Sequence, residues 1–155
     1  MKATASDIKK YLAILSETAP RLEQAVKGQG EAPLQFKADK TSWSVNEILA
    51  HLRACADLWT HSIYAMLAEN EPTFSDINER KWAKATKYAE LPFRESFQAF
   101  SLQRENLLRV LKALPIEAWA RSAIIFERKH TIFTQMRRLA KHEMDHIEQI
   151  ENLLK

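Results

Sequence analysis

Four long stretches of the chain repeat apolar residues at the three- and four-residue spacing of an amphipathic α-helix. We expect helices at residues 6–27, 44–68, 92–113 and 131–153. Each helix would bury one apolar stripe, and four such stripes close around a common core in a four-helix bundle. The chain has 155 residues, which suits one domain that spans residues 1–155. The predicted fold is therefore a single all-α domain.

Capping signals and prolines mark the ends of these helices. Ser44 and Glu47 have the spacing of a capping box, in which each side chain bonds to the backbone N–H of the other residue, so a helix should begin here. Ser6 is the expected N-cap of the first helix. Thr18 and Pro20 interrupt that helix, and proline cannot donate a backbone hydrogen bond, so we expect a bend or a restart there.

The segments between the long helices are less regular. Pro92 fits the first turn of the third long helix. A shorter helical piece is expected at residues 77–85, and a short turn or helix at residues 115–119. The stretch RSAIIFERKH, residues 121–130, is ambiguous, because its apolar run also fits an extended strand.

Composition excludes several classes of protein. The only two glycines, Gly28 and Gly30, are too few for an all-β fold or a phosphate-binding loop. The 23 basic residues are scattered among 20 acidic ones, so we expect no nucleic-acid partner. A single cysteine, Cys55, excludes an internal disulfide and suits a reducing compartment. Without a signal peptide or an apolar run of membrane-spanning length, we expect a cytoplasmic protein with no membrane partner.

Two histidines of the last helix lie at the edge of its apolar stripe. An α-helix advances about 100° per residue, so His146 lies about 40° from His142, next to the apolar arc. Glu143 lies at about 100°, in the centre of that arc. A carboxylate buried there needs a partner, which a metal, a metal-bound water or an arginine would supply.

The second long helix offers a third inward histidine. By the same arithmetic His51 lies at the edge of the buried face, whereas His61 lies on the polar side. His130 comes before or at the start of the last helix, far from His142. His51, His142 and His146 are therefore the candidate ligands of one divalent transition metal with positions left open for solvent. The alternative is that the three histidines only pack in the bundle.

Residues 142–146 also match H-E-x-x-H, the zinc-protease signature. The extended form of that signature needs a glycine three residues after the second histidine, where this chain has Gln149. The other common form takes its third ligand from a later helix, but only nine residues follow His146. A protease is therefore disfavoured.

Two motifs together resemble those of the DinB-like (DinB/YfiT) superfamily. The first is the pattern W-S-x-x-E-I-L-x-H-L at residues 43–52, and the second is H-x-x-x-H followed by a Q-I pair at residues 142–150. The Thr-x-Pro break in the first helix and Arg104 in the third are also similar. The resemblance covers almost the whole chain.

This resemblance implies a DinB-like four-helix bundle with a divalent metal, zinc, nickel or iron, held by His51, His142 and His146. It implies a homodimer. Relatives include thiol-dependent transferases and isomerases that use low-molecular-weight thiols such as bacillithiol or mycothiol. The expected function is therefore a metal-dependent hydrolase or a thiol-dependent transferase with a small-molecule substrate. A metal-stabilised binding or stress-response module is the alternative, and a metal-free structural bundle is a third.

Further residues have two interpretations each. Glu143 would orient a ligand or act as general base, and Arg104 would hold an anionic group of the substrate or lie on the surface. Cys55 would be a fourth ligand or a core residue. The tryptophans at positions 59, 82 and 119 would line a pocket or pack in the core, and Trp43 would pack against the start of its helix.

Overall fold

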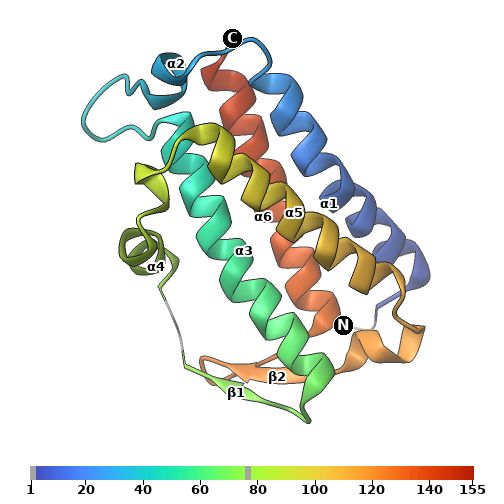
Figure 1. Ribbon diagram of the computed structural model, residues 1–155. Coiled ribbons are helices and arrows are strands. Elements are labelled where there is room, and N and C mark those ends of the chain that lie inside the picture. Colours follow the sequence, from blue (N-terminus) through green and yellow to red (C-terminus); the bar gives the residue numbers. More distant parts are fainter. Residues whose placement is uncertain (1–2, 76–77) are drawn as a thin grey trace.

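The computed structural model describes residues 3–75 and 78–155. Four long helices form a bundle, which confirms the predicted fold class (Figure 1). They are α1 (Ala5–Ala25), α3 (Val45–Ala68), α5 (Phe93–Lys112) and α6 (Ile132–Leu153). Each lies within a few residues of its predicted range.

The order of helix directions is unusual for a bundle. In Figure 1, α1 and α6 run upward, whereas α3 and α5 both run downward. Because α3 and α5 are parallel, the chain must cross back over the length of the bundle between residues 69 and 92. This crossover contains strand β1 (Thr73–Phe74), helix α4 (Glu79–Thr86) and the short helix η1 (Tyr88–Glu90). The α4 helix corresponds to the predicted piece at 77–85, of which Ile77 lies outside the described residues.

Helix ends follow the capping signals in part. Ser44 and Glu47 form the predicted capping box at the start of α3. The N-cap of α1 is Thr4 and not Ser6, because the Thr4 hydroxyl accepts the Asp7 N–H. Of the bend or restart expected at Thr18 and Pro20, the restart is wrong, since α1 continues through Pro20 to Ala25.

The other connections are short. The expected connector between the first two long helices holds one turn of helix, α2 (Glu31–Gln35). Pro92 is the N-cap of α5, one residue before the first turn where it was expected. The segment at 115–119 becomes the 3-10 helix η2 (Ile116–Ala120).

The ambiguous stretch at 121–130 is extended. Strands β2 (Ser122–Ile125) and β3 (Arg128–Thr131) form an antiparallel hairpin, and β1 adds to β2 in parallel. The two residues of the hairpin turn, Phe126 and Glu127, have φ of 47° and 60°. Two consecutive positive φ values are those of a type I′ turn, which matches the twist of paired strands. The small sheet closes the lower end of the bundle (Figure 1).

The core has two apolar parts separated by a polar layer. The upper part includes Phe100 and Ile147, and the lower part includes Leu107 and Leu139. Arg104 lies between Phe100 and Leu107 on α5, Glu143 lies between Leu139 and Ile147 on α6, and both are buried. The middle of the bundle is therefore where polar groups lie inside the protein.

The Asp57 carboxylate makes several of the contacts that attach the crossover to the bundle. Asp57 on α3 accepts hydrogen bonds from Trp82 Nε1 of α4 and Tyr88 Oη of η1, at 3.1 and 2.6 Å. Its other oxygen accepts from Gln103 Nε2 of α5 at 2.8 Å. Asp57 therefore fixes α4 and η1 against α3 and α5.

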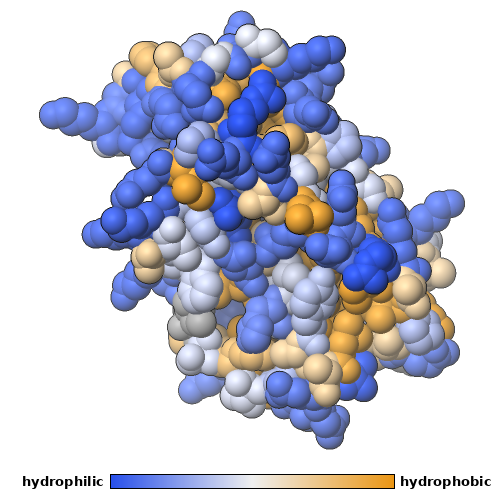
Figure 2. All heavy atoms as spheres, viewed as in Figure 1, coloured by the Kyte–Doolittle hydropathy of each residue, from blue (hydrophilic) through white to orange (hydrophobic). Residues whose placement is uncertain are grey.

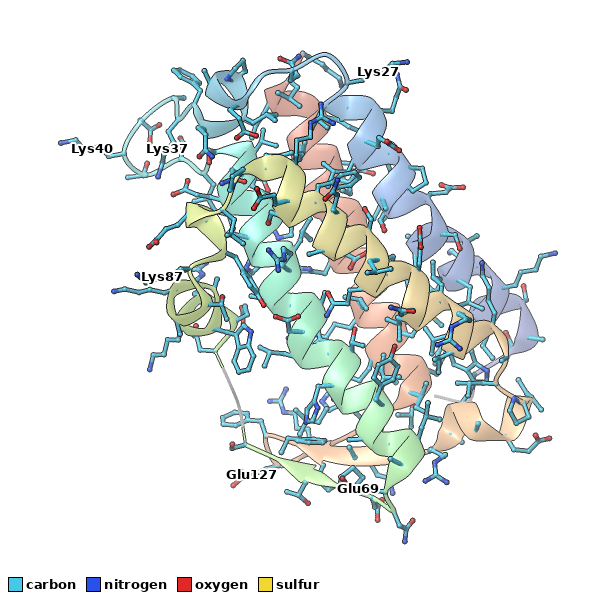
Figure 3. The ribbon with its side chains drawn as sticks, in the orientation of Figure 1. Lys27, Lys37, Lys40, Glu69, Lys87 and Glu127 are labelled. Carbon is cyan, nitrogen blue, oxygen red and sulfur yellow. The ribbon has the colours of Figure 1, made fainter. Side chains whose placement is uncertain are left out.

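The outer surface is mainly charged and polar. Figure 2 shows hydrophilic residues over most of the face in view, with hydrophobic ones gathered near the lower ends of α1 and α5. In Figure 3, Lys40, Lys87 and Glu127 point away from the helices. In the described part of the chain, every helix is too short or too polar to cross a membrane.

Candidate metal centre

Three histidines from two facing helices meet at one point. His51 comes from α3, and His142 and His146 come from α6. One ring nitrogen of each lies within 4.8 Å of the corresponding nitrogens of the other two. His51 is 8% exposed, and the other two are half-buried. The structure thus brings together the three residues that the sequence singled out.

The spacing of the imidazoles suits one metal ion. The Nε2 atoms of His51 and His142 lie 3.0 Å apart. Two nitrogens bonded to zinc at about 2.0–2.1 Å are roughly 3.3 Å apart in a tetrahedral site and roughly 2.9 Å apart in an octahedral one. The distance of 3.0 Å falls between these values, so the two rings can ligate the same ion without a large movement.

Burial keeps two of the rings neutral. It lowers the pKa of His51 to about 4, and the positive charge of His146 acts in the same direction. Burial likewise lowers the pKa of His142 to about 3, with further contributions from His146 and His51. Neutral imidazole is the form that donates a lone pair to a metal. Both rings are therefore in their ligating form at neutral pH.

Two neighbours orient the rings. His146 Nδ1 lies 2.9 Å from Gln149 Oε1, which accepts the Nδ1 proton and leaves Nε2 for a metal. The Trp43 ring lies against His51 and His146, with centroids 5.2 and 6.4 Å away. Sequence analysis placed Trp43 only at the helix start. A signal for Gln149 was present, because a residue three positions after His146 lies on the same side of the helix.

Cys55 lies beside the centre. Its Sγ is 3.6 Å from Nε2 of His51 and 3.9 Å from Nε2 of His142. Burial raises the pKa of the thiol to about 12, and the nearby carboxylate of Glu79 acts in the same direction. The group of ligand atoms within 4.8 Å of one another consists of the three histidines. The thiol is thus protonated in this environment and packs against the rings.

Glu143 and Arg104 pair with each other inside the bundle. They are 1% and 2% exposed, and Arg104 Nη2 donates to Glu143 Oε1. Burial raises the pKa of Glu143, while the Arg104 guanidinium opposes that shift. An arginine is thus the partner that Glu143 needed. The surface interpretation of Arg104 is wrong, and its guanidinium already binds a carboxylate of its own chain.

Of the other histidines and tryptophans considered from the sequence, most lie away from the metal centre. His61 is exposed and contacts Phe74, and His130 lies in β3, so neither belongs to the three-histidine group. Trp119 is 2% exposed in the core, and Trp82 binds Asp57. Trp59 alone of the three tryptophans borders the centre, with its ring 5.0 Å from that of His142 in a T-shaped contact.

Comparisons with known proteins agree with this architecture. Among solved structures, the chain is similar to YfiT from Bacillus subtilis, with a TM-score of 0.85 at 18% identity. The match covers 97% of this chain and 87% of that one. YfiT is described as a probable metal-dependent hydrolase with an unusual four-helix bundle topology, and the likeness at this identity shows the shared fold. No curated protein matches.

The family comparison covers nearly the same length. The family model of the DinB superfamily matches residues 14–150, which include the whole of the three-histidine group. Since the match extends over most of the sequence, the chain belongs to the DinB superfamily.

Proposed function

We propose that this protein is a metal-dependent hydrolase that binds one divalent transition metal through His51, His142 and His146. The observation that carries the proposal is the convergence of three imidazole nitrogens within 4.8 Å. Imidazole suits zinc, nickel and iron. The bound ion would polarise a carbonyl group of the substrate and lower the pKa of water bound to it.

The surrounding residues prepare the histidines for this role. His51 and His142 are neutral at pH 7 because burial lowers the pKa of both. Gln149 accepts the Nδ1 proton of His146, which leaves Nε2 of that ring unprotonated and able to bind a metal. Trp43 covers one side of the group and limits the access of water from that side.

Glu79 is our candidate for the general base. This residue begins α4, is half-buried, and makes no ion pair with the described residues. Glu79 lines a cavity together with Trp59, whose ring contacts that of His142. Burial lowers the pKa of His51, and the negative charge of Glu79 acts in the opposite direction. Glu143, the base expected from sequence, is instead paired with Arg104. We expect Glu79→Gln to lower kcat by roughly 10²–10⁴-fold and to leave the metal stoichiometry unchanged.

Metal content tests the core of this proposal. The purified protein should carry, or take up after a chelator wash, one zinc, nickel or iron ion per chain by elemental analysis. His146→Ala should abolish uptake, whereas His61→Ala and His130→Ala should retain it, since neither belongs to the group. Full stoichiometry in the triple alanine variant of the three ligands would overturn the assignment.

Activity tests the reaction class. A panel of carboxylic esters and amides should be hydrolysed by the metal-loaded protein, and chelation should abolish the hydrolysis reversibly. If turnover instead requires a low-molecular-weight thiol as co-substrate, the protein is a transferase and the hydrolase proposal is wrong. If the metal binds but neither reaction occurs, the centre stabilises a binding module.

A further inference from the structure

A partly enclosed cavity of about 80 Å³ lies between α3 and α6, next to the metal centre. Trp59 and Gln135 line it from these two helices, Glu79 from α4, and Phe74 and Ile125 from the sheet. A water needs only about 10–15 Å³ of such volume, so there is room for a small organic group.

The cavity and the metal centre share one seam between two helices. On α6 the residues Gln135, Arg138, His142 and His146 are spaced by three, four and four, so they lie on one face of the helix. On α3 the residues His51, Cys55, Trp59 and Ser62 are spaced by four, four and three, with the same result. The two helices run in opposite directions (Figure 1). His51 of α3 therefore lies beside His142 and His146 of α6 at the metal centre. Trp59 and Ser62 of α3 lie beside Gln135 and Arg138 of α6 at the cavity.

Gln135 is a buried amide with free hydrogen-bonding capacity. It is 0% exposed, and within the described residues neither Nε2 nor Oε1 has a hydrogen-bond partner. Leaving a buried polar group unpaired costs about 1–3 kcal/mol, so such groups in native proteins call for an explanation. Since the amide lines the cavity, a ligand in the cavity would supply the missing partner.

Arg138 places a positive charge at the same cavity. Its guanidinium carbon lies 4.4 Å from the centroid of the Trp59 ring, a cation–π contact that holds the planar group in place. The side chain is exposed and makes no ion pair within residues 3–75 and 78–155. A guanidinium held by its face keeps its N–H edge free, and that edge matches a carboxylate in a bidentate manner.

We propose that this cavity is the substrate-anchoring subsite of the metal centre and binds a monocarboxylate with an apolar body. Arg138 and the Gln135 amide would hold the carboxylate, and the Trp59 ring would contact the apolar part. Glu79 is the other charged residue at the cavity, and it disfavours a second negative charge on the ligand. This inference rests on the proposed hydrolase function, because the ligand is placed as its substrate.

Helix geometry also limits the length of the substrate. Arg138 and Gln135 precede His142 by four and seven residues, which correspond to about 6 and about 10 Å along the helix axis. The bond to be hydrolysed would therefore lie roughly 6–10 Å from the carboxylate. The subsite favours carboxylic acids that carry their ester or amide group at the far end of a short apolar chain or ring.

Calorimetry with phenylacetate, and with neutral phenylacetamide as the matched probe, tests the subsite. The full chain is titrated both loaded with zinc and after a chelator wash, because carboxylates also bind zinc directly. We expect phenylacetate to bind the washed protein more tightly than phenylacetamide. Arg138→Gln should weaken phenylacetate at least roughly tenfold and remove the preference over the amide.

Two control variants test whether the loss of phenylacetate affinity comes from the Arg138 guanidinium itself or only from the removal of a positive charge. Lys141→Gln removes the same charge from an exposed position of α6 and should change neither affinity. Arg138→Lys keeps the charge without the planar fork, so it should bind phenylacetate with intermediate affinity. Equal binding of the two probes, or unchanged affinity in Arg138→Gln, would overturn the subsite. Because zinc stoichiometry is measured on the same samples, loss of the metal centre would be recognised separately.

Discussion

The Nε2 atoms of His51 and His142 lie 3.0 Å apart, although 91 positions of the sequence separate the two residues. Only the packing of α3 against α6 brings them together, since each helix alone supplies one or two of the three rings. The metal centre is therefore a product of the tertiary fold. Its geometry is sensitive to any change in how these two helices meet.

The pH dependence of stability should reveal the buried histidines. In the folded metal-free protein the pKa values of His51 and His142 are lowered to about 4 and about 3. The unfolded chain, with ordinary histidine pKa values near 6.5, therefore takes up protons first as the pH falls. The free energy of unfolding should be unaffected by these groups above about pH 6.5. It should fall from pH 6.5 to about 4 through His51 and to about 3 through His142, by about 1.4 kcal/mol per unit of pKa difference.

Chemical denaturation of the metal-free protein at pH 7 and pH 5 measures this effect. His142→Asn should flatten the dependence, whereas His61→Asn should not, because His61 is exposed. Equal slopes for the wild type and His142→Asn would contradict the prediction. Metal binding by His51 and His142 should also persist below pH 6.5, where histidines with an ordinary pKa would take up protons.

The ion pair between Arg104 and Glu143 should matter for stability. Arg104→Met leaves the Glu143 carboxylate buried without its partner, which typically costs about 3–5 kcal/mol. The double variant Arg104→Met/Glu143→Leu should be more stable than Arg104→Met, since no charge remains unpaired. Thermal unfolding of the three proteins measures both differences.

Metal stoichiometry distinguishes a structural role of this pair from a direct one. Both variants should still bind one zinc per folded chain, because the described contacts of the pair do not include the three histidines. A folded double variant that failed to bind zinc would show that Glu143 or Arg104 supports the centre after all.

Cys55 should remain a thiol when the metal binds. Its Sγ does not belong to the group of ligand atoms that all lie within 4.8 Å of one another, and in the metal-free protein burial raises the pKa of the thiol to about 12. The cobalt-loaded protein should therefore lack thiolate-to-cobalt charge-transfer absorption in the near ultraviolet, and Cys55→Ala should retain full metal stoichiometry. An intense band that disappears in Cys55→Ala would instead identify Cys55 as a fourth ligand.

The homodimer implied by the family resemblance stays a prediction. Sedimentation equilibrium at micromolar concentration should give twice the mass of the chain. Leu102 is a candidate interface residue because it is apolar and 61% exposed on α5. Leu102→Glu should then shift the protein toward monomer, and a wild-type monomer at these concentrations would rule the dimer out.

Periodicity was sufficient to predict the four helices and the inward histidines. The apolar arc of the last helix placed His142 and His146 at its edge and Glu143 at its centre, and all three lie where the arc implies. Whether Glu143 faced a metal or an arginine depended on the rotation of α5 relative to α6, which no local pattern encodes. Gln135 lies about 20° from His142 on the same face, so its position was available as a signal.

The small sheet was harder to predict for physical reasons. Strand β1 has two residues, Thr73 and Phe74, too few for any alternation to show. The hairpin turn uses Phe126 and Glu127 at positive φ, where glycine or asparagine is the usual signal. Pairing between neighbouring strands stabilises these conformations, and this pairing cannot be predicted from the composition of the segment.

The crossover that lets α3 and α5 run in parallel has a second consequence. The same segment supplies Glu79, whose carboxylate lines the cavity beside the metal centre, while Asp57 attaches this segment to α3. The ligands of the metal come from α3 and α6 alone. The proposed general base and the metal ligands thus come from different stretches of chain, whereas Gln135 and Arg138 share α6 with two of the ligands. A substitution of Glu79 can therefore change the reaction without altering the ligand set.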